Sequence, residues 1–203
     1  MTSTPKNLAI ILAAGASTRM GTCKASLPWF QGKTLLSYQV EQWLIAGITP
    51  IVVLGSHNAH HQNDCPQGSR VVINSFSSQG KTSSILKGLR LLPQDFKVVA
   101  VSAIDQPRST EVYQKLLKES RDYAAMITAP SYKGRLGHPL FFSNKLLSYL
   151  ENIREETAGL RQVVQEFYSV IQKVEFDTPD VLADLNTPES YKTFLEKQLA
   201  WLS

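Results

Sequence analysis

The sequence contains few of the features that mark secreted, membrane-spanning or nucleic-acid-binding proteins. Its first apolar run, residues 8–12, is too short for the core of a signal peptide or for a membrane span. Only two cysteines occur, Cys23 and Cys65, so a disulfide framework is excluded and a reducing compartment is expected. No run of four Lys or Arg residues occurs, and the net charge is only +4. We therefore expect a cytoplasmic protein that binds neither membranes nor nucleic acid, with a charge that suits an anionic ligand.

Two common nucleotide-binding fingerprints are also missing. Gly15 is followed by Ser17 and Met20 at the positions where the dinucleotide-binding pattern requires glycine. The tripeptide Gly-Lys-Thr occurs twice, at 32–34 and 80–82, but a leucine and a serine stand where a P-loop has its first glycine. The sequence thus excludes both of these standard ways of binding a phosphate.

What the sequence does contain is a regular alternation of apolar strand-like runs and helical stretches. With 203 residues, 43% of them hydrophobic, the chain is long enough for one domain with a sizeable core. The alternation predicts a single-domain, Rossmann-like α/β fold over residues 1–203, with a mostly parallel sheet and helices on both faces. Residues 130–143 break the alternation, so we expect an antiparallel strand or a sheet insertion there. The expected strands are 8–12, 50–55, 70–74, 98–104, 124–129, 139–143 and 170–176, and the expected helices are 34–47, 83–92, 110–120, 145–152, 160–167 and 188–202.

In sheets of this kind, ligands bind outside the carboxyl ends of the strands. The candidate segments are therefore those that follow the predicted strands: 13–24, 55–61, 74–84, 105–108 and 177–187. The first segment is rich in small residues, which let a ligand approach the backbone closely, and it carries Arg19 and Lys24. These cations suit phosphate oxygens, although a solvated basic turn has a similar composition.

The stretch LAAGASTRMGTCKASLP, residues 12–28, resembles the signature LAAG-x-S-x-R-M-G-x-x-K-x-L-L-P of the MobA-like nucleotidyltransferases, which act on the molybdenum cofactor. Ser26 stands where the signature has its first leucine. In that family the loop wraps the triphosphate of an incoming nucleoside triphosphate. The resemblance implies that Arg19 and Lys24 stabilise charge on the phosphates. It also implies backbone contacts to base and phosphate from Leu12, Ala13, Ala14 and Gly15.

A second cluster, AIDQP at residues 103–107, places Asp105 at the end of a strongly apolar strand. A carboxylate followed by a strand-ending proline is well placed to hold a cation, and it also fits an Asp that starts a turn. In the family, an Asp-Gln-Pro or Asp-x-Pro motif supplies a magnesium ligand here, and Asp-Gln-Pro is typical of the cytidylyltransferase branch. The guanylyltransferase branch more often has a cysteine where Ile104 stands.

The stretch NSFSSQGKTSSILKGL, residues 74–89, leads into a predicted helix. Ser83 and Ser84 are expected near its N-terminus, where serine caps a helix and where an anion can bind. The stretch resembles the family element N-x-x-x-x-x-G-M-x-x-S-[IL]-x-x-G, which implies nucleotide contacts from Gly80 and the two serines. Lys81 replaces the usual methionine, and a lysine there suits a phosphate.

The motif GRLGHP, residues 134–139, combines two glycines and a proline, which predict a tight loop. A histidine in such a loop is commonly a structural turn residue. The motif resembles the G-R-x-G-H-P element of the cytidylyltransferase branch, which lines the acceptor side, where the pterin phosphate binds. The stretch 155–164 resembles the Gly-Ala-Arg element of the same branch, and Arg161 is the matching arginine. The implied acceptor-binding residues are Arg135, Gly137, His138 and Arg161.

The stretch DLNTPESY, residues 184–191, opens the last predicted helix, and a Thr-Pro pair is reason enough for a helix to begin there. That reason does not account for Asp184 and Asn186. The cytidylyltransferase branch usually has D-I-D-T-P-E-D at this point, so Asn186 replaces its second Asp and still offers a carbonyl oxygen to magnesium. We expect Asn186 to be the second metal ligand beside Asp105, and Asp184 is the alternative.

Together, these motifs imply a magnesium-dependent nucleotidyltransferase with Arg19, Lys24 and Asp105 as its catalytic residues. An acceptor phosphate would attack the α-phosphorus of the nucleoside triphosphate and release pyrophosphate. The resemblance implies CTP and molybdopterin as substrates, with the nucleotide bound by the chain up to about residue 110 and the acceptor by the remainder. The alternatives are guanylyl transfer, transfer to a sugar or alditol phosphate, and a non-catalytic chaperone that carries the cofactor to a molybdoenzyme partner.

Overall fold

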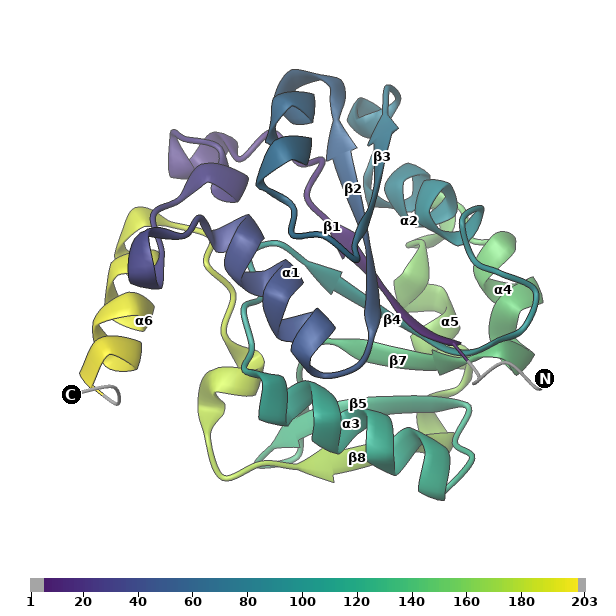
Figure 1. Ribbon diagram of the computed structural model, residues 1–203. Coiled ribbons are helices and arrows are strands. Elements are labelled where there is room, and N and C mark those ends of the chain that lie inside the picture. The colour runs from purple at the N-terminus through teal and green to yellow at the C-terminus, as the bar shows by residue number, and fades with distance from the viewer. Residues whose placement is uncertain (1–5, 201–203) are drawn as a thin grey trace.

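The computed structural model describes residues 6–200, which form one eight-stranded sheet between two layers of helices (Figure 1). The strand order is β3-β2-β1-β4-β7-β5-β6, and β8 pairs with β5. The strands are β1 (Lys6–Leu12), β2 (Thr49–Gly55), β3 (Arg70–Asn74), β4 (Phe96–Ala103), β5 (Ile127–Tyr132), β6 (Arg135–Leu136), β7 (Leu140–Ser143) and β8 (Ile171–Glu175). The helices are α1 (Leu35–Ile45), α2 (Lys81–Leu89), α3 (Thr110–Asp122), α4 (Leu147–Glu151), α5 (Leu160–Glu166) and α6 (Pro188–Ala200).

The strand β1 is the centre of the parallel half of the sheet because its apolar residues are buried on both faces. It pairs in parallel with β2 on one side and with β4 on the other. The register places Leu12 beside Val53 of β2 and Ala103 of β4. Since these strands are parallel, their carboxyl ends meet at one edge, and the segments that follow β1 and β4 leave the sheet side by side.

The other half of the sheet contains the antiparallel strands. The strand β7 runs antiparallel to both β4 and β5, and β5 forms an antiparallel pair with β6. The strand β8 is parallel to β5. The antiparallel strand that we expected within residues 130–143 is therefore confirmed, and the chain adds it without leaving the single sheet.

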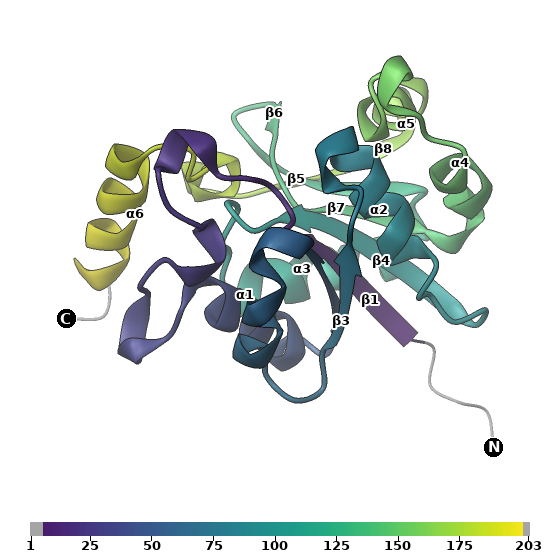
Figure 2. The same ribbon diagram turned by 90° about the horizontal axis from the view of Figure 1, so that it is seen from above.

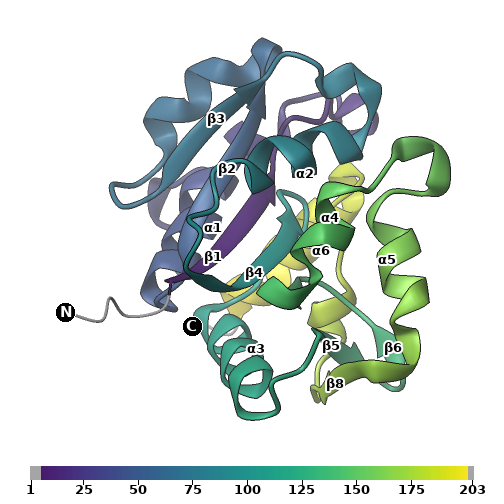
Figure 3. The same ribbon diagram turned by 90° about the vertical axis from the view of Figure 1, so that its right-hand side faces the viewer.

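Helices cover both faces of the sheet, as the alternation predicts. On one face, α1 and α3 pack through Trp43 and Tyr113, whose ring centroids are 3.6 Å apart in a stacked arrangement. On the other face, α2, α4 and α5 bury Ile85, Leu150 and Val163. Figure 2 shows the two layers on opposite sides of the strands, and Figure 3 brings α2, α4 and α5 to the front. Each face of the sheet thus has its own apolar core.

The start of α2 differs from the prediction of a helix over 83–92. The helix begins at Lys81, directly after Gly80, whose φ of 101° is readily accessible only to glycine. Ser83 and Ser84 therefore lie within the first turn of the helix and do not occupy its N-cap position. The two serines lie near the helix N-terminus, as expected, but the alternative that they cap the helix is wrong because Gly80 holds the N-cap position.

Two further predicted boundaries differ from the observed elements. The strand expected at 124–129 is β5, which lies three residues later because its pairing with β8 extends to Ser131. The expected helix at 188–202 corresponds to α6 up to Ala200, and residues 201–202 lie outside the described part of the chain.

Two further features of the described residues concern the helices and the two cysteines. Among residues 6–200, no helix combines the length and the apolar character that crossing a bilayer requires. Cys23 and Cys65 are free thiols. Burial, reinforced by the charge of Asp64, raises the pKa of Cys65 to about 11, so this thiol is protonated at neutral pH.

Candidate active site

A pocket of about 270 Å³ opens at the edge of the sheet where β1 and β4 end. Its walls come from the loop after β1, the start of α2, the residues after β4 and the segment before α6. Lys81 and Asn186 line it as well. The pocket brings together all but two of the predicted nucleotide-binding residues: Leu12, Ala14, Gly15, Arg19, Lys24, Gly80, Ser84 and Asp105.

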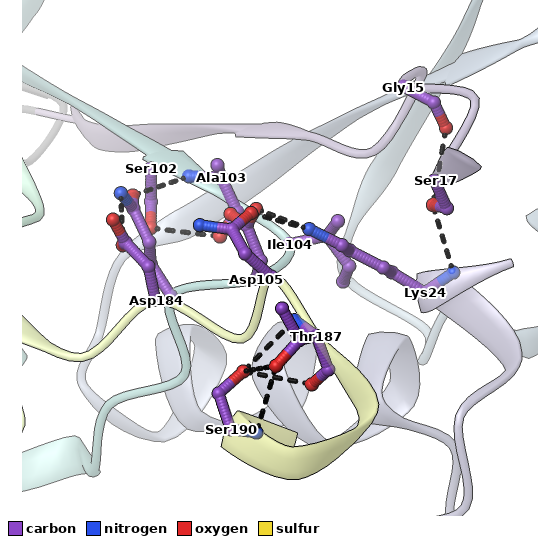
Figure 4. Close-up of polar contacts among 12 residues, drawn as sticks. Gly15, Ser17, Lys24, Ser102, Ala103, Ile104, Asp105, Asp184, Thr187 and Ser190 are labelled. Atoms are coloured by element: carbon purple, nitrogen blue, oxygen red, sulfur yellow. Dashed lines mark hydrogen bonds and ion pairs between the residues drawn. The ribbon is translucent and has the colours of Figure 1, made fainter. Parts of the chain in front are cut away.

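Lys24 joins the loop after β1 to two segments that lie much further along the chain. Its Nζ donates to Asp105 Oδ2 at 2.7 Å and to Asn186 Oδ1 at 3.0 Å. Figure 4 shows the lysine side chain extended toward Asp105. Lys24 is only 8% exposed, so its interaction with Asp105 is shielded from water and stronger than a surface ion pair. These three side chains form the charged centre of the pocket.

Side chains that bond to the backbone hold the loop after β1 in shape. Ser17 adopts a left-handed conformation, and its Oγ accepts a hydrogen bond from the Lys24 N–H at 3.2 Å (Figure 4). Asn58 is buried, and its Nδ2 donates to Ala13 O at 2.8 Å while its Oδ1 accepts from Gly55 N at 2.8 Å. The motifs do not single out Asn58, and its place just after a strand is the only sequence signal for it.

The segment before α6 separates the two alternatives for a second metal ligand. Asp184 Oδ1 accepts a hydrogen bond from Gln106 Nε2 at 2.9 Å, and Gln106 Oε1 accepts one from Ala103 N at 3.0 Å. Asp184 is thus bonded to the residue that follows Asp105. Asn186, two residues later, lines the pocket together with Asp105. Asn186 therefore reaches the pocket, whereas Asp184 bonds to Gln106 outside it, and Asn186 as the second metal ligand stays a prediction.

The oxygen atoms of Asp105 and Asn186 face a common point, since one lysine nitrogen contacts both of them. A carboxylate oxygen and an amide carbonyl oxygen are hard ligands of the kind that Mg²⁺ prefers. Within residues 6–200, no three His, Cys, Asp or Glu side chains cluster to hold a metal ion. Two protein oxygens suit Mg²⁺, because this ion keeps water molecules and substrate phosphates in its other positions. The residues present therefore fit the expected metal.

A second pocket, of about 310 Å³, lies directly beside the first, and the two share Leu12, Lys81 and Ala103 in their walls. Its other walls come from α2, the end of β4, the loop before β7 and the start of α5. His138 and Arg161, two of the predicted acceptor-binding residues, both line it. The structure thus offers adjoining spaces for two substrates.

Besides Asp184, four predicted residues line neither of these pockets. The Ala13 N–H donates to Val53 O, and Ala13 O accepts a hydrogen bond from Asn58 Nδ2. The Ser83 hydroxyl donates to backbone carbonyl oxygens at 2.9 and 3.0 Å. Arg135 is exposed on β6. Gly137 is close to another backbone segment, and a Cβ at this position would lie 2.1 Å from Val181 O. The predicted ligand contacts of these residues stay predictions, and packing explains the glycine by itself.

Arg108 is a buried residue that supports both pockets, and the motifs did not identify it. It is 4% exposed, and burial lowers its pKa to about 10, so it remains charged at neutral pH. Its guanidinium donates to four backbone carbonyl oxygens at 2.8 to 3.1 Å, those of Pro107, His138, Val181 and Ala183. The arginine therefore ties the end of β4 to the His138 loop and to the segment that leads to Asn186.

Replacing Arg108 with methionine is expected to lower the free energy of unfolding by about 3 kcal/mol, because four carbonyl groups lose their donor in a buried region. Chemical denaturation of the wild-type and variant proteins measures this loss. Arg121→Met, at an exposed position in the last turn of α3, is the matched control and should change the free energy by less than about 0.5 kcal/mol. Equal effects of the two substitutions would show that the buried network is not stabilising.

His138 is partly buried in the wall of the second pocket, and this burial lowers its pKa below 6.5. The nearby charges of Arg108 and Lys81 act in the same direction, whereas Asp184 and Asp105 oppose them. The folded protein therefore binds a proton at His138 less readily than the unfolded chain does. Stability from this residue is fully present above pH 6.5 and is lost as the pH falls toward the lower folded-state pKa.

A His138→Gln variant is expected to lose less stability than the wild type between pH 7.5 and pH 5.5, since glutamine does not titrate. Denaturant unfolding at both pH values measures the difference. Gln114→Asn, a change between amides at an exposed position of α3, is the control and should keep the wild-type pH dependence. If the wild type and His138→Gln lose the same stability on acidification, burial does not lower the pKa of His138.

A sheet that carries a small-residue loop, a lysine and an acidic residue at the ends of its central strands has the arrangement of a nucleotidyltransferase. The chain belongs to the MobA-like NTP transferase family, whose domain matches residues 9–173. This match confirms the resemblance seen in the motifs. Lys24 and Asp105 lie inside the matched region, and Asn186 lies beyond its end.

Relatives and a solved structure cover nearly the whole chain. Molybdenum cofactor cytidylyltransferase of Escherichia coli (strain K12) is 28% identical over 193 residues, which cover 93% of this chain and 95% of that protein. Nicotine blue oxidoreductase of Paenarthrobacter nicotinovorans is 26% identical over 200 residues, covering 93% and 96%. A nucleotidyl transferase from Methanothermobacter superposes with a TM-score of 0.80 at 22% identity, covering 97% of this chain and 99% of that one. Because the two relatives have names from different reaction classes, these similarities establish the family and the fold, and they leave the substrates open.

Proposed function

We propose that the protein transfers CMP from CTP to molybdopterin or a similar phosphorylated acceptor, with Mg²⁺ as its cofactor. The observation that carries this proposal is the meeting of Lys24, Asp105 and Asn186 beside the wall that the two pockets share. The segment after β4 contributes Asp105 to the first pocket and Gln106 to the second. Family membership supports the reaction class, and similarity to the E. coli cytidylyltransferase over 93% of the chain supports these two substrates.

In the proposed reaction, a phosphate oxygen of the acceptor forms a bond to the α-phosphorus of CTP. The bond from that phosphorus to the bridging oxygen breaks, and pyrophosphate leaves with the bonding electrons. Lys24 brings positive charge to the α-phosphoryl group, and Arg19 brings it to the pyrophosphate. Mg²⁺ held by Asp105 and Asn186 would supply further neutralisation of phosphate charge. A phosphate acceptor is already ionised, so the reaction needs no general base.

The two substrates are assigned to the two pockets. The first pocket takes CTP, since it contains the loop after β1 and both proposed metal ligands. The second takes the acceptor, with His138 and Arg161 beside it. The expected division near residue 110, with the nucleotide bound before it and the acceptor after it, is not strict in this arrangement. Asn186 lines the nucleotide pocket, and α2 lines the acceptor pocket.

Pyrophosphate release with molybdopterin and each of CTP, GTP, ATP and UTP tests this proposal. We expect Mg²⁺-dependent turnover with the highest kcat/KM for CTP, and mass spectrometry of the product should show one added CMP. A preference for GTP would contradict cytidylyl transfer, and turnover with a sugar or alditol phosphate but not with molybdopterin would contradict the acceptor. Pterin binding without any turnover would contradict the enzymatic function and favour a chaperone that serves a molybdoenzyme partner.

A further inference from the structure

The loop that leads into α5 lies against the first turn of α2, although 73 residues separate the two contact points. Glu155 Oε2 accepts a hydrogen bond from Thr82 N at 2.9 Å. A Cβ placed on Gly80 would lie 2.3 Å from the Glu155 carboxyl carbon, so the carboxylate rests directly on the glycine backbone. At the other end of the loop, a Cβ on Gly159 would lie 2.5 Å from Thr82 Oγ1. Both ends of the loop therefore contact the same helical turn.

This loop also has a closed shape of its own. The Gly159 N–H donates to Arg154 O at 2.8 Å, and the Thr157 N–H donates to the same oxygen at 3.2 Å. Gly159, at a φ of 55°, is followed directly by α5, in which Arg161 is the second residue. The position of Arg161 is thus coupled to the contact that Glu155 makes on α2.

The contact lies where the two pockets adjoin. Glu155 and Arg161 line the second pocket, and Lys81, the first residue of α2, lines both. Hydrogen bonds from the Thr82 side chain and backbone lower the pKa of Glu155, with smaller contributions from the Lys81 N–H and its charge. An ionised carboxylate at a helix N-terminus is also favoured by the helix dipole. The contact with Glu155 explains the Gly-Lys-Thr tripeptide at 80–82, which is not part of a P-loop. Gly80 leaves room for the Glu155 carboxylate, and Thr82 donates a hydrogen bond to it.

We propose that Glu155 is a positioning residue for the acceptor, which docks residues 154–161 on α2 and so holds Arg161 in the wall of the second pocket. This inference rests on the proposed function, because it assumes that the second pocket binds the acceptor. It assigns no contact between Glu155 and a substrate. The carboxylate acts through the loop that it anchors.

Steady-state kinetics of Glu155→Ala should show a KM for the acceptor raised about fivefold, while the KM for CTP stays within about twofold of the wild type. Glu155→Gln keeps an oxygen that can accept a hydrogen bond from Thr82 N. The increase in its acceptor KM should therefore be about half of that in Glu155→Ala on a logarithmic scale. Glu156→Ala removes a neighbouring exposed carboxylate and is the matched control, with no change in either KM. Equal increases in both KM values, or the same effect in Glu156→Ala, would overturn the positioning role.

Hydrogen exchange provides a readout that does not depend on activity. Amides in residues 154–161 and the Thr82 amide should exchange faster in Glu155→Ala than in the wild type and in Glu156→Ala, because the loop loses its anchor. Unchanged exchange would overturn the docking contact. If exchange changes but the wild type turns over no acceptor, the proposed function has failed while the docking contact stands. If exchange changes and the acceptor KM does not, the docked loop has no role in acceptor binding.

Discussion

Replacing Asp105 with asparagine is expected to lower kcat for the proposed nucleotidyl transfer about a thousandfold at saturating CTP and acceptor. The substitution keeps the shape of the side chain and one oxygen, but it removes the negative charge from the pair of oxygens that Asp105 forms with Asn186. Two neutral oxygens hold a divalent cation poorly, so the Mg²⁺ concentration at half-maximal rate rises as well. Pyrophosphate release across a magnesium titration measures both effects, and denaturant unfolding verifies that the variant is folded.

Asp184→Asn is the matched control, since it makes the same chemical change in the neighbouring segment. Asp184 accepts a hydrogen bond from Gln106 Nε2, which an amide oxygen can also accept. We therefore expect a rate within about threefold of the wild type. A large loss of kcat in Asp184→Asn together with a small loss in Asp105→Asn would show that Asp184, and not Asp105, is the metal ligand. Small losses in both would remove this acidic pair from the mechanism.

The central sheet was predictable from the sequence because buried parallel strands leave a strong local pattern. The apolar run at 98–104 corresponds to β4 within two residues, and the run at 70–74 corresponds to β3 at both ends. The extent of β5 was not predictable because it depends on the distant β8, whereas the start of α2 was missed although Gly80 is a local signal for it. Glu155 bonds the first turn of α2, and β8 pairs with the end of β5. No local pattern at residues 81 or 130 encodes these contacts.

The charged centre of the site was predictable because motifs that resemble those of the family lie in the segments that follow β1, β4 and β8. Lys24, Asp105 and Asn186 were singled out in this way, and the structure brings them within hydrogen-bond distance of one another through the lysine. The buried residues that support them were missed. Asn58 bonds to the backbone of Gly55 and Ala13, and Arg108 bonds to four backbone carbonyl groups; such bonds leave no pattern in the sequence.

The position of Lys24 gives its charge two opposing effects. Its Nζ contacts the oxygens of Asp105 and Asn186 at 2.7 and 3.0 Å, which are the atoms proposed to hold Mg²⁺. The ammonium group and a divalent cation would therefore compete for the same two oxygens. In the proposed function, the charge of a bound cation would repel the ammonium group toward the triphosphate, where its charge is needed during transfer.

Replacing Lys24 with methionine should separate these effects. We expect kcat to fall about a hundredfold, because the α-phosphoryl group loses its cationic partner. Mg²⁺ binding to the protein without nucleotide, measured by titration calorimetry, should become tighter because the competing charge is gone. Lys33→Met removes an ion pair with Glu41 elsewhere on the protein and should leave both quantities unchanged. Weaker Mg²⁺ binding in Lys24→Met would show that the lysine holds the two oxygens in place instead of competing for them, and an unchanged kcat would exclude Lys24 from the transfer step.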